Sequence, residues 1–136
     1  RNVERAIHYF QHTAFIDLHD RKGSTQDGVH MAATGGTWQS VIAGFGGMRI
    51  RNRRLSFKPW LPKNWQEIRF KIKWHGDDIK IRIHQEEAEF FWITDKTETM
   101  NIDVMEKTII LTPNTPAKVT FTPEEKPIEV TAPEEE

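Results

Sequence analysis

Hydrophobic and basic residues alternate strictly in two segments near the middle of the chain, residues 68–74 and 79–83. A period of two places successive side chains on opposite faces of a β-strand, so we expect each segment to have one dry and one wet face. In the first segment the dry face carries Ile68, Phe70, Ile72 and Trp74, and the wet face carries Arg69, Lys71 and Lys73. The polar segment 75–78 between the two predicts a hairpin turn.

The same pattern predicts strands through the whole second half of the chain. The expected strands are 48–51, 54–58, 66–74, 78–85, 89–94, 100–105, 107–112 and 118–122. Strands with one dry face bury it against a second sheet, so we expect a small antiparallel β-sandwich.

The first part of the chain has a helical period instead. Apolar residues recur every three or four positions over residues 2–15, and the polar stretch 17–28 with its two glycines predicts a loop. A second helix is expected over about 29–45, strained or kinked near Gly35-Gly36 and ended by Gly46-Gly47.

Size and composition limit the possible roles. The 136 residues, 15.9 kDa in mass, suit one domain or a domain with a small attachment. The formal net charge of -1 gives no reason to expect a nucleic-acid or membrane-surface partner. The chain has no cysteine, which excludes disulfides and fits a cytoplasmic protein. No apolar stretch approaches the length of a membrane span.

The two ends of the sequence also carry expectations. The chain begins with Arg1 inside an expected helix, so we expect a piece of a longer protein. The end, 123–136, is rich in proline and glutamate, and we expect it to be an acidic, poorly ordered tail.

The most suggestive chemistry lies in the run 27–39, where His30 and two threonines stand beside a Gly-Gly pair. Each glycine within a helix costs about 1 kcal/mol relative to alanine, so a pair of them indicates that the small residues are used. Three uses are open: tight helix packing, a ligand, or an anion held by backbone N–H groups. Equally, His30 could bond a backbone carbonyl, and Thr34, Thr37 and Ser40 could bond back to helix carbonyls.

Five tryptophans are many for a small domain, and burial in the core is the commoner fate of such side chains. Trp74 and Trp92 lie in expected strands and are expected in the core. Trp60 and Trp65 bracket a loop and are candidates to staple the sandwich to the helices.

No metal site is indicated by the sequence. His8 and His12 are four residues apart on a helix with Glu4 one turn earlier, yet this matches no zinc-protease spacing, and a solvated helix face is the favoured interpretation. No acid–base carboxylate pair, phosphate-binding P-loop or nucleophile elbow is present.

An ordered series of motifs resembles the C-terminal part of glycoside hydrolase family 65. The motifs are 9–18, 27–30, 35–38 and 44–49, and the match is extended by 55–59 and 61–65. This family holds the inverting phosphorylases of maltose, kojibiose, nigerose and trehalose, together with some hydrolases. The resemblance covers roughly residues 3–85.

The resemblance implies an α+β fragment: the last helices of an (α/α)6 barrel followed by a small antiparallel β-sandwich. Residues 1–47 would then be C-terminal helices of the catalytic barrel, 48–122 the sandwich and 123–136 the tail. The remainder of the barrel is the implied partner, together with the disaccharide and phosphate. A homodimer of the full-length protein is one open arrangement, and no nucleic-acid or membrane partner is expected.

The resemblance also implies an activity. A complete enzyme would cleave an α-glucosidic disaccharide with phosphate to give β-glucose 1-phosphate and glucose, with phosphate as co-substrate and no cofactor. The family's general-acid glutamate lies upstream, so no catalytic residue is expected here and the isolated chain should be inactive. The implied phosphate-binding residues are His30, Thr34, Gly35 and Gly36.

Other functions stay open on the sequence. A hydrolase of the same family would use water in place of phosphate, with a carboxylate base upstream. A non-catalytic β-sandwich would bind carbohydrate or support a larger domain. Some maltose phosphorylases carry Ala-Gly where this chain has Gly35-Gly36, so the disaccharide itself stays open.

Overall fold

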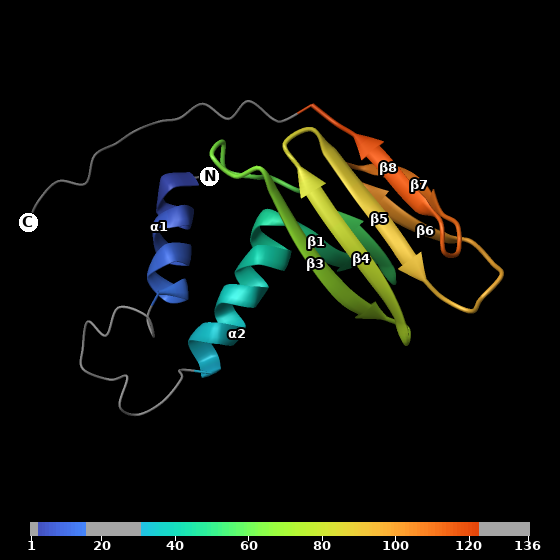
Figure 1. The fold of residues 1–136 in the computed structure, drawn as a ribbon, viewed down its shortest axis with the longest axis horizontal. Coiled ribbons are helices and arrows are strands. Elements are labelled where there is room, and N and C mark those ends of the chain that lie inside the picture. Colours follow the sequence, from blue (N-terminus) through green and yellow to red (C-terminus); the bar gives the residue numbers. More distant parts are fainter. Residues whose placement is uncertain (1–2, 16–30, 123–136) are drawn as a thin grey trace, which may run out of the picture. The chain divides into compact units, whose positions relative to one another are not determined.

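The computed structural model describes residues 3–15 and 31–122 of the chain (Figure 1). The chain divides into two compact units, one holding residues 1–37 and 124–136 and the other holding 38–123. The expected loop 17–28 and the expected acidic tail 123–136 lie outside the described residues.

Helix α1 (Val3–Ala14) confirms the first predicted helix. Its half-buried positions are spaced three or four residues apart, at Ile7, Phe10, Thr13 and Ala14, so one stripe of the helix is shielded from water. His8 and His12 are exposed, in agreement with the expected solvated face.

Helix α2 (Met31–Gln39) continues without a break into η2, a π-helix over Ser40–Phe45. The prediction of strain near Gly35-Gly36 was wrong, because these glycines lie within regular α-helix and the distortion begins one turn later. The wider π turn ends with the Gly46 N–H donating to the carbonyl of Val41 at 2.8 Å. Gly47 then leaves the helix with a φ of +62°, as expected for the end of this helix.

Eight strands follow, and they form two four-stranded sheets (Figure 1). One sheet has the order β1-β2-β6-β7, from β1 (Met48–Arg51), β2 (Arg54–Phe57), β6 (Met100–Val104) and β7 (Lys107–Leu111). The other has the order β3-β4-β5-β8, from β3 (Glu67–Trp74), β4 (Asp77–His84), β5 (Glu87–Ile93) and β8 (Pro116–Thr120). Each predicted strand is present, with ends shifted by at most two residues.

The β3–β4 hairpin has the predicted faces. Ile68 and Ile72 are buried and pair with Ile83 and Ile79, while Arg69, Lys71 and Lys73 are exposed. Trp74, expected in the core, is only half-buried, because it ends the strand and packs edge-on against the His75 ring, with ring centroids 4.5 Å apart. Trp92 is buried as predicted.

The sandwich is not wholly antiparallel, which corrects the expectation. Strand β6 pairs with β2 in parallel, through Ser56↔Asp103 and Phe57↔Val104. The chain leaves this sheet after β2, builds β3–β5 in the other sheet and returns beside β2 in the same direction. A parallel pair needs such a long crossover, and alternation along a strand carries no information about its partner's direction.

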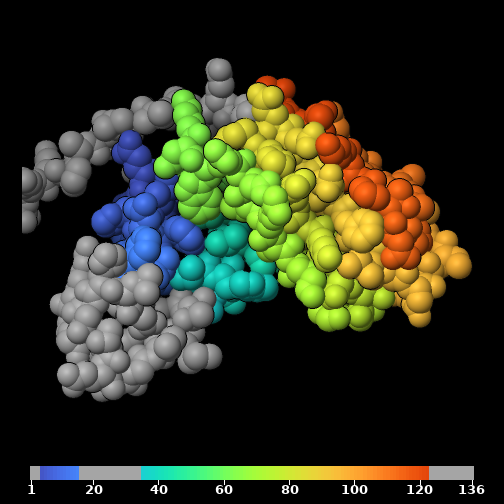
Figure 2. All heavy atoms as spheres, in the orientation of Figure 1, coloured from blue at the N-terminus to red at the C-terminus, as the bar shows by residue number. Residues whose placement is uncertain are grey.

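The two sheets share one hydrophobic core. Phe57 of one sheet and Phe90 of the other contact across it, with ring centroids 5.0 Å apart, and both are fully buried. Figure 2 shows the outer side chains of β3, β4 and β5, in green to yellow, covering this face of the sandwich. Ile42 and Phe45 of η2 are buried as well, so the helical segment that precedes β1 adds to the hydrophobic core.

Candidate functional site

Only some of the residues predicted to bind phosphate lie within the described part of the structure. His30 lies outside the described residues. Thr34, Gly35 and Gly36 all lie within α2, and the Thr34 side chain is also outside the described part. The structure therefore brings the three α2 residues together on one helix, and the assignment of phosphate binding to all four stays a prediction.

Helix geometry limits how these residues can act. The first four N–H groups of an α-helix have no partner within the helix, and in α2 these belong to residues 31–34. Gly35 and Gly36 come one turn later, where a regular helix uses each N–H to bond the carbonyl four residues back. An anion at this end of α2 would thus meet the N–H groups of residues 31–34.

The space around the Gly-Gly pair is open. A Cβ built on Gly35 or Gly36 would meet no heavy atom within 4 Å in the described structure. Tight packing against the described residues therefore does not explain the pair. A use of this pair in binding a ligand or an anion stays a prediction.

The C-terminal end of this helix, η2, packs against the residues that follow it in the chain. Phe45, the last residue of η2, is buried and lies between Trp60 and Trp65, with ring centroids 6.0 and 4.8 Å away. The Trp60 N–H donates to the Phe45 carbonyl at 2.8 Å. The Arg49 guanidinium donates to the Ala43 carbonyl at 2.6 Å. The two tryptophans therefore staple η2 to the sandwich, as predicted.

Three carboxyl groups of the sandwich, those of Asp77, Glu67 and Asp78, have a lowered pKa. A hydrogen bond from Lys96 is the main cause of the lowered pKa of Asp77, and Thr94 and Trp92 also donate to this carboxylate. Hydrogen bonds from Arg69 to Glu67 and from Lys73 to Asp78 likewise lower the pKa of each carboxyl.

A general acid for glycoside cleavage needs the opposite shift, a raised pKa that keeps its proton near neutral pH. The lowered pKa values of Asp77, Glu67 and Asp78 do not suit that role. Within the described residues, no three histidine or acidic side chains gather closely enough to hold a metal ion. No helix in the described part is long and apolar enough to cross a membrane.

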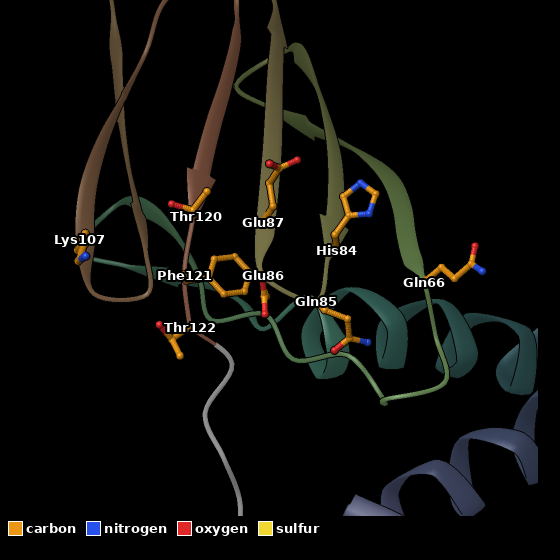
Figure 3. A pocket seen from close by; sticks show the side chains of 9 residues that line it. All are labelled: Gln66, His84, Gln85, Glu86, Glu87, Lys107, Thr120, Phe121 and Thr122. Atoms are coloured by element: carbon orange, nitrogen blue, oxygen red, sulfur yellow. The ribbon is translucent and has the colours of Figure 1, made fainter.

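Sequence reasoning missed one feature, an open trough of about 800 Å³ at one end of the sandwich (Figure 3). Its lining includes His84, Gln85 and Glu87 around the β4–β5 turn, Phe121 after β8 and Lys107 of β7. The lining comes from two short runs, 84–87 and 120–122, with Gln66 and Lys107 added, and no motif in the sequence links the two runs. A cluster of polar residues around a turn was the only available signal.

Comparison with known families gives two matches in chain order. Residues 1–39 match the central catalytic domain of glycosyl hydrolase family 65, and residues 48–111 match the C-terminal domain of the same family. The first match covers α1 and α2, and the second begins with β1 and ends with β7.

Individual relatives agree with this. The chain is 36% identical to an alpha,alpha-trehalose phosphorylase of Geobacillus stearothermophilus, over 88% of this chain and 15% of the relative. It is 34% identical to a kojibiose phosphorylase of Halothermothrix orenii, over 78% of this chain and 14% of that protein. It is 32% identical to a maltose phosphorylase of Bacillus subtilis, over 79% of this chain and 14% of that protein. The chain thus spans about a seventh of the length of these enzymes.

A solved structure shows the same fold. A human-microbiome protein that carries the provisional name kojibiose phosphorylase superimposes with a TM-score of 0.77 at 24% identity. The alignment covers 88% of this chain and 17% of that one. The arrangement of the described elements is therefore one that also occurs within a much longer protein.

Proposed function

Since the chain belongs to glycosyl hydrolase family 65, we propose that it forms the C-terminal part of an inverting disaccharide phosphorylase. The complete enzyme cleaves an α-glucosidic disaccharide with phosphate and releases β-glucose 1-phosphate and glucose. The observation that carries the proposal is the pair of matches, catalytic domain and then C-terminal domain, in one short chain. Relatives that are phosphorylases of trehalose, kojibiose and maltose support it.

In the proposed reaction, the residues that act on the substrate come partly from this chain and partly from the rest of the enzyme. A glutamic acid outside this chain protonates the glycosidic oxygen, and phosphate attacks the anomeric carbon from the opposite face, inverting its configuration. Because phosphate is itself the nucleophile, the enzyme needs a group of donors that holds an anion rather than a carboxylate base. The lowered pKa values of Asp77, Glu67 and Asp78 agree with a general acid elsewhere.

In this proposal the start of α2 holds the phosphate. His30 directly precedes Met31, the first residue of α2, where backbone N–H groups lack helical partners. A donor from the imidazole and N–H groups from the first turn would hold the phosphate oxygens, with Thr34 beside them. The open space at Gly35 and Gly36 would let the substrate approach the helix backbone.

The roles of the other parts follow from this assignment. The remainder of the barrel is the partner that supplies the acid and the sugar subsites, and the isolated chain is inactive. The absence of cysteine favours a cytoplasmic location for the enzyme.

The phosphate role is tested by His30→Ala in an enzyme that joins this segment to the upstream regions of a family 65 phosphorylase. Removing one donor from a preorganised anion site costs about 2.7–4 kcal/mol of transition-state stabilisation, which is about 10²–10³ in kcat. The release of glucose 1-phosphate measures the loss, and thermal unfolding shows whether the fold is kept. His8→Ala is the matched control, because His8 is an exposed histidine of α1.

Full phosphorolysis by the His30→Ala enzyme would rule out the phosphate role. A wild-type enzyme that releases only glucose, at the same rate with and without phosphate, would instead identify a hydrolase of the family. An enzyme that keeps its rate when 48–122 is replaced by an unrelated sandwich would show that the β-domain is only a support.

A further inference from the structure

The trough at the end of the sandwich contains polar side chains that are already fixed in place. The Gln85 amide nitrogen donates to the carbonyls of Pro62 and Trp65, at 2.8 and 2.7 Å. The Nε2 atom of His84 lies 3.3 Å from a carboxylate oxygen of Glu67, and Glu87 lies 3.3 Å from the Lys118 ammonium. Each contact uses one end of the side chain and holds the other end in a defined position.

The second ends of these side chains are available to a ligand. Within the described residues no hydrogen bond uses the Gln85 Oε1, the His84 Nδ1 or the second carboxylate oxygen of Glu87. Two of these atoms accept hydrogen bonds, and the imidazole nitrogen can donate or accept. Because the side chains are already ordered, a ligand that binds them loses little affinity to side-chain ordering.

An aromatic ring completes the lining. Phe121 is half-buried, and its N–H donates to the Glu86 carbonyl at 2.9 Å, which ties the end of β8 to the β4–β5 turn. In Figure 3 the Phe121 ring lies between Lys107 on one side and Gln85 and His84 on the other. The trough therefore combines one apolar ring face with polar groups on both sides.

This composition selects a class of ligand. The charged side chains of the lining have both signs: Glu86 and Glu87 are acidic, Lys107 is basic, and Glu87 is already paired with Lys118. Because neither sign prevails, the lining favours neither an anion nor a cation, and a neutral ligand fits it best. A pyranose ring is neutral, has an apolar face of C–H groups for an aromatic ring, and carries hydroxyls that both donate and accept around its edge. Pockets of this kind fix their ligands through a few placed polar groups beside an apolar surface.

We propose that this trough is a binding site for a neutral saccharide, seated on Phe121 and oriented by Gln85, His84 and Glu87. Its volume of about 800 Å³ lies within the range of small-molecule sites. The site uses neither phosphate nor the start of α2, so it can fail or stand independently of the proposed phosphorylase activity.

The test is a titration of the full chain with maltotriose, followed by the NMR shifts of the backbone amides. Saturable shifts are expected at residues 84–88 and 120–122. Phe121→Leu keeps an apolar side chain but removes the ring, and it should weaken binding about five- to tenfold. Phe121→Tyr keeps the ring and should bind as the wild type does. Phe91→Ala is the matched control, since it removes a half-buried aromatic side chain of the neighbouring strand β5 that does not line the trough.

Several outcomes would overturn the proposal. These are no saturable shift with maltotriose, an equal loss of binding in Phe91→Ala, or unchanged binding in Phe121→Leu. A titration with inorganic phosphate separates a second possibility. If phosphate shifts the same amides at lower concentration than maltotriose, the trough is an anion site and the saccharide proposal is wrong.

Discussion

The glycines of α2 and those at the end of η2 have opposite surroundings. A Cβ on Gly35 or Gly36 would enter open space, whereas a Cβ on Gly46 would lie 2.6 Å from the Ile42 carbonyl oxygen and 3.0 Å from the Phe70 ring. At Gly46-Gly47 the glycines are needed because the chain packs closely on itself. At Gly35-Gly36 nothing in the described structure needs them. The difference teaches that the same residue pair is required by close packing at one site and is not required by any described neighbour at the other.

The largest effect on stability is expected in the hydrophobic core between the two sheets. Phe90→Ala removes a side chain with no exposed surface, and it should lower the free energy of unfolding by about 3–5 kcal/mol. Urea unfolding followed by tryptophan fluorescence measures the change. Ile110→Ala, at a side chain that is 61% exposed, should stay within about 0.5 kcal/mol of the wild type. Equal losses in the two variants would contradict the assigned core.

Gly47→Ala tests the close-packed side of the comparison. The residue would have to adopt a φ of +62° and its Cβ would overlap the backbone of Lys58, so we expect a loss of about 1–3 kcal/mol. The same unfolding experiment measures it. A variant as stable as the wild type would show that the chain can leave η2 in another conformation.

Gly35→Ala tests the open side and should change stability in the opposite direction. Alanine is the better helix former and meets no neighbour there, so the isolated chain should gain about 0.5–1 kcal/mol. A loss of stability in the isolated chain would mean that Gly35 is packed after all. In a complete enzyme, a loss of turnover together with the gain of stability would support ligand approach at this helix.

The smallest effect is expected at Asp77 and depends on pH. The pKa of this carboxyl is lowered in the folded protein, chiefly by its hydrogen bond from Lys96, so the folded state favours the charged form. That contribution is present above the unfolded pKa and is lost as the pH falls through the folded pKa. Asp77→Asn should therefore lower the melting temperature at neutral pH and bring it closer to the wild type in acid. A difference that does not change with pH would contradict the charged interaction.

Most of the sandwich was predictable from the sequence because the faces and turns of a strand depend on residues that are close together in the chain. Alternation from Ile68 to Trp74 fixed the two faces of β3, and the turn was recognisable from His75-Gly76, both of which adopt positive φ. The parallel pairing of β2 with β6 was not predictable in this way, since it depends on how the chain returns to this sheet after residues 58–99. The π-helix was missed for a related reason. Its wider turn is supported by Phe45 packing on Trp60 and Trp65, which lie beyond the helix in sequence.

The candidate sites were predictable to different degrees. The Gly35-Gly36 pair stood out because glycine is costly in a helix, so a local cost indicated a use. The trough gave no such signal, because none of its residues is unfavourable where it stands. Gln85 and Phe121 acquire their arrangement only when β4, β5 and β8 align.

Strand β3 also has a consequence for how copies of the protein behave in a crowded solution. It is an edge strand of its sheet, eight residues long, and an unpaired edge can accept a strand from another molecule. Its outer face carries Arg69, Lys71 and Lys73, whose side chains pair with Glu67 and Asp78 of the same sheet. A second molecule that added a strand here would have to fit beside this row of charged side chains. Charged side chains along an edge strand are a common means of disfavouring edge-to-edge pairing, so we expect the alternation in β3 to limit self-association as well as to set its two faces.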